Sequence, residues 1–140
     1  MPCSFIYTYY NNVYMKTHQQ RIGQIGEALA KKHLEKEGYK ILDQNYRQKW
    51  GEIDIIAKQN KEIVFVEVKT MAYTHFSYSP NPALLPEDEV TSKKLENLNK
   101  AILYYLNVNH LDVPYRLDLI TIQIDISRKK YRLRHFHNIN

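Results

Sequence analysis

Two apolar segments that carry charged residues place the strongest constraint on this fold. Residues 51–57 and 63–70 both read as buried β-strands, yet Asp54 interrupts the first, and Glu67 and Lys69 interrupt the second. Successive side chains of a strand alternate between its two faces, so Glu67 and Lys69 must share one face. Burying an unpaired charge is costly, so these positions must be paired or must hold a ligand.

The register of the expected hairpin brings two of these acids together. A turn centred on Asn60 and Lys61 is even in length, so Asp54 lies directly opposite Glu67. Opposed side chains in an antiparallel pair have Cβ atoms roughly 4.5–5.5 Å apart, and like charges there are destabilising. Two carboxylates held so close are well placed to bind a divalent cation through oxygen ligands. An odd loop would put the two acids on opposite faces, so the metal prediction depends on this turn.

The periodicity of the remaining chain predicts a helix before these strands and another after them. Apolar residues at helical spacing define one stripe of the first helix, and Gly38 is its expected end. Glu27 falls on the flank of that stripe, on a helix that can lie over the acidic strand face. The expected elements are a helix over 20–37, strands over 40–46, 51–57 and 63–70, a helix from Thr91 or Ser92 that ends before Pro114, and strands over 115–126 and 130–138.

The length of the chain fits one domain around a single core. We assign residues 19–140 to this domain and residues 1–18 to an N-terminal extension. Residues 71–90 hold three prolines and show little periodicity, so we expect an irregular loop there.

The composition of the chain indicates which class of partner and which cellular compartment to expect. The formal net charge is +5, which suits an anionic partner such as nucleic acid. The single cysteine, Cys3, excludes an internal disulfide and a zinc site built from several cysteines. No apolar run approaches the roughly 20 residues of a membrane span, and the first residues do not read as a signal peptide. We therefore expect a cytoplasmic protein with no membrane partner.

A series of short motifs follows in order along about residues 20–125 of this chain. They are Arg21-Ile22-Gly23, Gly26-Glu27-Ala28, Gly38-Tyr39, Asn45-Tyr46-Arg47, Gly51-Glu52-Ile53-Asp54, residues 64–70, Val90-Thr91 with Lys94, and Arg116-Leu117-Asp118. This series resembles the YraN family of uncharacterised bacterial proteins, within the PD-(D/E)xK nuclease superfamily. The arrangement is also similar to that of archaeal Holliday junction resolvases.

The resemblance implies an α/β fold of the restriction-endonuclease-like kind, with a central mixed β-sheet flanked by helices. It implies a Mg²⁺-dependent (or Mn²⁺-dependent) endonuclease that hydrolyses DNA phosphodiester bonds, with branched or junction DNA as a candidate substrate. The implied catalytic residues are Glu27, Asp54, Glu67 and Lys69, of which the three acids would bind the metal. RNA stays open as a partner, and junction resolution would need two active sites and hence a homodimer.

Further residues are candidates for supporting roles around such a site. Lys93 and Lys94 lie where the second helix begins and where phosphate is favoured. The candidate contacts to nucleic acid are Arg21, Arg47, Lys93 and Lys94, and the candidate residues that brace the acids are Glu52, Thr70 and Asp118.

Structural readings compete with these functional ones. Asp54, Glu67 and Lys69 would also fit a buried ion network, and Glu27 a solvated helix residue. For three other sets of residues we favour a structural role. We expect Arg116 and Asp118 to form an ion pair, Thr91 to cap a helix, and His135 and His137 to pack on the surface. The basic strand near the C-terminus would either follow a nucleic-acid backbone or be a solvated edge strand. The rival function is a non-catalytic nucleic-acid-binding or assembly module that retains the nuclease fold.

Overall fold

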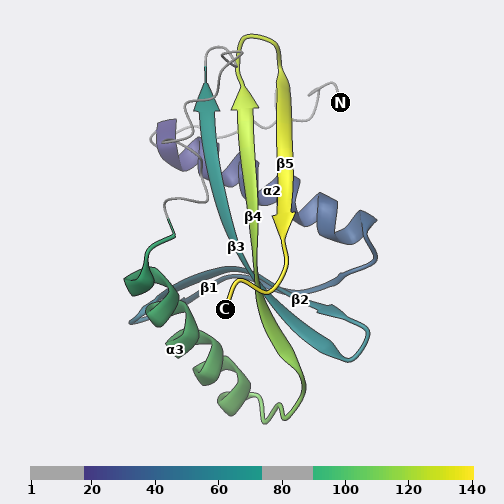
Figure 1. Ribbon diagram of the computed structural model, residues 1–140, viewed down its shortest axis with the longest axis vertical. Coiled ribbons are helices and arrows are strands. Elements are labelled where there is room, and N and C mark those ends of the chain that lie inside the picture. Colours follow the sequence, from purple (N-terminus) through teal and green to yellow (C-terminus); the bar gives the residue numbers. More distant parts are fainter. Residues whose placement is uncertain (1–17, 74–89) are drawn as a thin grey trace.

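The computed structural model describes residues 18–73 and 90–140. In these residues the chain forms an α/β domain, with a mixed sheet of five strands and two helices (Figure 1). The order of helix, three strands, helix and two strands confirms the order predicted from the sequence. The elements are α2 (His18–Lys36), β1 (Lys40–Gln48), β2 (Gly51–Gln59), β3 (Glu62–Tyr73), α3 (Ser92–Val108), β4 (Tyr115–Asp125) and β5 (Lys130–Phe136).

Two predictions fall wholly or partly outside the described residues. The expected extension over residues 1–18 is described only at its last residue, where α2 begins. The expected irregular loop over 71–90 is wrong at residues 71–73, which continue β3, and residues 74–89 lie outside the described residues.

The strands lie side by side in the order β1-β2-β3-β4-β5. Neighbouring strands are antiparallel except β3 and β4, which are parallel along their whole pairing. A parallel pair needs a crossover connection, and α3 forms part of the segment that joins β3 to β4. The sheet is therefore mixed, with the longest strand, β3, at its centre.

The hairpin of β2 and β3 has the predicted register. Ala57 pairs with Val64 and Gln59 with Glu62, so the turn consists of two residues. The first of them, Asn60, has φ of 54°, a left-handed conformation that asparagine tolerates better than most residues. The same register continued along the strands places Asp54 across from Glu67 on one face.

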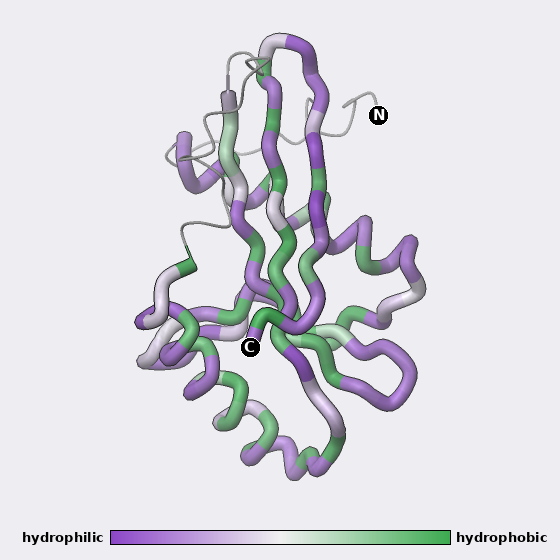
Figure 2. The backbone as a smooth tube through the Cα atoms, viewed as in Figure 1, coloured by the Kyte–Doolittle hydropathy of each residue, from purple (hydrophilic) through white to green (hydrophobic). Residues whose placement is uncertain are grey.

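Two apolar clusters cover the two faces of the sheet. The first joins α2 to one face, and the second joins α3 to the other face (Figure 2). Phe65 and Ile56 belong to the cluster of α3. Glu67 and Asp54, each two residues away along the same strands, therefore lie on the side of the sheet that α3 covers in part. Neither described helix is long and apolar enough to cross a membrane.

Both helices have ends that the sequence predicted. Thr91 caps α3, because its Oγ1 accepts the backbone N–H of Lys94 at 3.2 Å. Gly38 follows α2 with φ of 88°, and its N–H and that of Tyr39 are donated to the last turn of the helix. These two bonds, to the carbonyls of Glu35 and Leu34, form the motif that typically ends a helix at a glycine.

Helix α2 approaches the sheet most closely at Gly26. A Cβ atom at this position would overlap the side chain of Thr70 on β3. Gly23, one turn earlier in the same helix, has no such neighbour within 4 Å. The absence of a side chain at residue 26 thus sets how near the helix lies to β3.

We predict opposite effects for alanine at these two glycines. Gly26→Ala should lower the free energy of unfolding by about 1–3 kcal/mol, the usual cost of overpacking. Gly23→Ala, the matched control, should raise it by up to about 1 kcal/mol, because alanine is the better helix former. Chemical denaturation of both variants measures the difference. Equal effects at the two sites would contradict the close approach of α2.

Candidate metal centre

The carboxylate of Glu67 is the central group of the candidate site. Its side chain is 4% exposed, and Oε1 pairs with Nζ of Lys94 at 3.2 Å. The other oxygen, Oε2, is buried and has no hydrogen-bond partner in the described part of the chain. An ionised carboxylate can accept about four hydrogen bonds, so a buried oxygen with none is costly. This oxygen is therefore available to a ligand with positive charge.

Asp54 lies across from Glu67, and its environment disfavours its negative charge. Burial raises the pKa of Asp54 well above its ordinary value of 3.8, and the charge of Glu67 raises it further. The charge of Glu27 adds to this effect. The backbone N–H of Val68, which is donated to Oδ2 of Asp54 at 2.7 Å, acts in the opposite direction. Three acids thus act on one another here, and a bound cation would relieve their repulsion.

The strands part at this same place. The residue pairs of β2 with β3 end at Ile55 with Val66, immediately before Asp54 and Glu67. In Figure 1, β1 and β2 run at an angle to β3, β4 and β5. The acids therefore lie where the sheet opens.

Glu27 comes to the site from α2, which packs on the opposite face of the sheet from the one we expected. The apolar residues of α2 cluster with Val64 and Val66, whose side chains point away from the face of Glu67. The sequence placed this helix over the acidic face, and that expectation is wrong. Glu27 nevertheless lies close enough to raise the pKa of Asp54. Gly26, the preceding residue, lies against Thr70 of β3.

Asn45 links two acids of this region and was not predicted to have a role. The register of β1 with β2 places it across from Asp54, with φ of 52°. With its amide nitrogen turned toward the acids, Asn45 donates to Oε2 of Glu27 at 3.0 Å and to Oε1 of Glu52 at 2.7 Å. Asn45 therefore orients Glu27, and Glu52 contributes through it. Predicting this role for Asn45 would have required the register of β1 with β2, which we did not derive from the sequence.

The two lysines near Glu67 have different positions. Lys69 lies two residues along β3 on the same face and is half-buried. Lys94, which we expected to meet nucleic acid, pairs with Glu67 instead. Its ammonium group supplies the positive charge beside Glu67 in this structure.

The other predicted contacts to nucleic acid have other surroundings. Arg47 is 81% exposed and pairs with Glu52 at 3.4 Å. Lys93 is exposed and pairs with Glu96 at 3.7 Å, within α3. The Nε atom of Arg21 is buried and has no hydrogen-bond partner in the described residues.

Two of the three predicted bracing residues face α2 and not the acids. Thr70 packs against Gly26. Asp118 pairs with Val66 across β3 and β4, so its side chain lies on the opposite face from Glu67. The structure therefore places Asp118 outside the acidic site.

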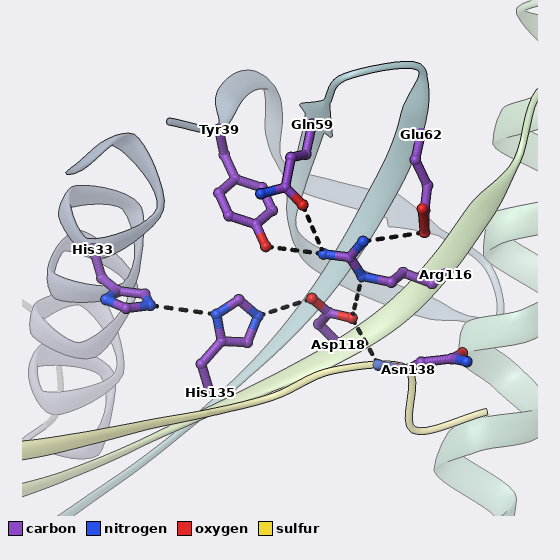
Figure 3. Close-up of polar contacts among 8 residues, drawn as sticks. All are labelled: His33, Tyr39, Gln59, Glu62, Arg116, Asp118, His135 and Asn138. Carbon is purple, nitrogen blue, oxygen red and sulfur yellow. Dashed lines mark hydrogen bonds and ion pairs between the residues drawn. The ribbon is translucent and has the colours of Figure 1, made fainter. Parts of the chain in front are cut away.

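Asp118 belongs to a second polar cluster (Figure 3). The expected pair with Arg116 is confirmed, at 2.9 Å from Nε to Oδ1. Oδ1 also accepts the backbone N–H of Asn138, and Oδ2 lies 2.8 Å from Nε2 of His135. The expectation that His135 packs on the surface is wrong, because its side chain is only 8% exposed. Arg116 bonds further to Tyr39, Gln59 and Glu62.

A family model and the relatives similar in sequence point to the same protein family. Residues 26–122 match the model of the uncharacterised protein family UPF0102. A UPF0102 protein of Alkaliphilus oremlandii is 41% identical over 122 residues, which cover 85% of this chain and 97% of that one. A UPF0102 protein of Geobacter metallireducens is 44% identical over 109 residues, 77% of this chain and 84% of that one. One of Thermotoga maritima is 43% identical over 96 residues, 69% and 81% of the two chains.

Among solved structures, SfsA of Pyrococcus furiosus in complex with Ca²⁺ is similar to this chain at 13% identity and a TM-score of 0.35. The match covers 86% of this chain and 64% of that one.

The raised pKa of Asp54 predicts how stability depends on pH in the absence of divalent ions. The folded chain retains a proton on Asp54 at pH values above 3.8, where the unfolded chain has lost it. The free energy of unfolding should therefore fall as the pH rises from the ordinary pKa through the raised one. Asp54→Asn, which can still accept the N–H of Val68, should reduce this fall and raise Tm at pH 7. Thermal unfolding between pH 4 and 8 tests this, and an unchanged or lower Tm at pH 7 would contradict it.

Proposed function

We propose that this chain, which belongs to the uncharacterised protein family UPF0102, is a metal-dependent nuclease of the PD-(D/E)xK superfamily. UPF0102 is the YraN family, which its sequence motifs resemble. Its reaction would be hydrolysis of DNA phosphodiester bonds. The observation that carries this proposal is the buried, unpartnered Oε2 of Glu67 across from Asp54. A chain that only binds nucleic acid has no need of a buried acid whose charge acts on a second acid beside it.

The donor atoms of the site fit a hard divalent cation. Asp54 and Glu67 offer carboxylate oxygens, and Glu27 is held nearby by Asn45. Mg²⁺ is usually bound by one or two carboxylates, with water and substrate phosphate completing its shell, and Mn²⁺ suits the same ligands. Bound there, the ion would acidify a water molecule and neutralise charge on the scissile phosphate.

The lysines of the site would act on the substrate. Lys69 shares the face of Glu67, so its ammonium group would orient the attacking water or stabilise charge that develops on the phosphate. Lys94 neutralises Glu67 when no other cation is present, and it lies in the first turn of α3. Backbone N–H groups at a helix start also favour phosphate, so this end of α3 suits the substrate backbone.

A basic strand face next to the site supports nucleic acid as the substrate. Lys69 pairs with Thr121 across β3 and β4, and Thr121 pairs with Arg134 across β4 and β5. Arg134 and Arg132 are exposed, and alternation places both on the face of Lys69 and Glu67. Figure 2 shows hydrophilic residues along much of β5. This row of positive charge would follow a phosphate backbone past the acids.

We predict that cleavage depends on the two acids and on Lys69. Wild-type protein with Mg²⁺ or Mn²⁺ should cut linear, nicked or four-way-junction DNA, and junction cutting would require two copies of the chain. Asp54→Asn and Glu67→Gln should abolish cleavage, and Lys69→Met should slow it by about 10²–10³-fold, as for loss of one charge-stabilising donor. Gel assays on labelled DNA measure these rates.

Glu62→Gln provides a control for the loss of an acid. Glu62 lies at the start of β3 and pairs with Arg116, away from the site. Its loss should leave the rate of cleavage unchanged.

Binding of the metal can be measured separately from cleavage, since Mg²⁺ at one hundred times its Kd stabilises the fold by about 2.7 kcal/mol. This shift should vanish in Glu67→Gln. DNA binding without cleavage, and without a Mg²⁺-dependent shift in Tm, would instead support the rival binding module.

The basic face generates a separate prediction for binding. Arg134→Gln should weaken DNA binding for all sequences and lower the slope of log K against log [salt] by about 1. Lys36→Gln removes the same charge from the exposed C-terminal end of α2 and should leave binding unchanged. Fluorescence anisotropy at several salt concentrations measures both variants. Equal losses in the two would show that only net charge matters.

A further inference from the structure

Three histidines meet on the side of the sheet that faces α2, away from the acidic site. His33 comes from the last turn of α2, His135 from β5, and His137 from the chain just after β5. His135 and His137 are stacked, with ring centroids 4.1 Å apart, and the rings of His33 and His135 are 5.4 Å apart edge to face. Figure 3 shows His33 and His135 pointing toward each other. None of these side chains has a part in the proposed nuclease reaction.

The distance between two of the ring nitrogens fits a shared metal ion. Nε2 of His33 lies 3.3 Å from Nδ1 of His135. Two imidazoles bound to one tetrahedral Zn²⁺ at 2.0–2.1 Å place their nitrogens about 3.3–3.4 Å apart. A third imidazole lies beside this pair: the ring of His137 stacks on that of His135, and one ligand atom each of His135, His137 and Asp118 lie within 4.8 Å of one another.

Asp118 fixes the direction in which His135 offers its lone pair. Oδ1 of Asp118 accepts from Nε of Arg116 and from the N–H of Asn138, so the carboxylate is an acceptor. Its Oδ2, 2.8 Å from Nε2 of His135, therefore holds the proton on that nitrogen. The other nitrogen, Nδ1, is left with a lone pair that points at His33. A carboxylate behind a histidine in this way is the usual support of a metal-binding imidazole.

We propose that His33 and His135 bind a transition-metal ion of the Zn²⁺ class between their facing nitrogens, with Asp118 orienting His135 and with His137 as a supporting residue stacked on His135. Imidazole nitrogen suits Zn²⁺, Cu²⁺ and Ni²⁺, whereas Mg²⁺ prefers oxygen, so the acidic site and this one take different ions. His137 is exposed, which gives the ion a path from solvent. Bound metal joins the end of α2 to β5.

The test is a titration of the protein with Zn²⁺ in a Cys3→Ser, Glu67→Gln background, which removes the single thiol and the acidic site. We expect one ion to bind and to raise Tm. His33→Gln and His137→Asn should each weaken binding by at least the 10–100-fold that loss of a supporting residue typically costs. Calorimetric titration gives the affinities, and circular dichroism checks that each variant folds.

His110→Asn is the matched control for His137→Asn. His110 is exposed after α3, with φ of 53°, which asparagine also adopts readily. Zn²⁺ affinity should be unchanged in this variant. Two results would overturn the proposal: no Zn²⁺ binding in the parent protein, which would leave an N–H···N bond between His33 and His135, or equal affinity in all three histidine variants.

Discussion

The hydrogen bond from the N–H of Val68 to the carboxylate of Asp54 is the contact on which the rest of the site depends. Through it, a backbone N–H of β3 is bound by a side chain of β2, at the point where the pairing of these two strands ends. Because the strands part there, Asp54 and Glu67 face each other without closing into an ordinary ladder, and Glu27 can come near from α2. The apolar clusters on both faces stabilise this opening, and the repulsion of the acids opposes it.

Local patterns in the sequence predicted most of the framework. The alternation of charges in residues 51–57 and 63–70 and the even turn after Gln59 were enough to place Asp54 across from Glu67. Helix ends at Gly38 and Thr91 followed from capping chemistry, which is local as well. The face on which α2 packs could not be predicted, since it depends on the fit of Gly26 against Thr70. The role of Asn45 depends on the register of β1, which no turn residue specifies.

Two buried acids in neighbouring positions of the sheet, Asp118 and Glu67, differ in how completely their oxygens are hydrogen-bonded. Asp118 and Arg116 each have several hydrogen-bond partners. Burial alone would raise the pKa of Asp118, but the hydrogen bonds from His135, Asn138 and Arg116 outweigh it, so that this pKa is lowered. Glu67, one row along and on the other face, keeps a buried oxygen without a partner. A fully bonded cluster stabilises the fold by itself, whereas an incomplete one gains from a ligand. This contrast explains why Asp118, predicted to brace the acids, serves a different part of the molecule.

The close approach at Gly26 also bears on which ions the acids can accept. Ligands of Mg²⁺ must come within 2.0–2.1 Å of the ion, while Ca²⁺ accepts 2.3–2.6 Å and a looser shell. Glu27 follows Gly26, a residue that has no side chain. A methyl group at residue 26 would overlap Thr70, so that α2 or Thr70 would have to shift. In the proposed metal site, the room for an ion would thus depend on packing on the far face of the sheet as well as on the carboxylates.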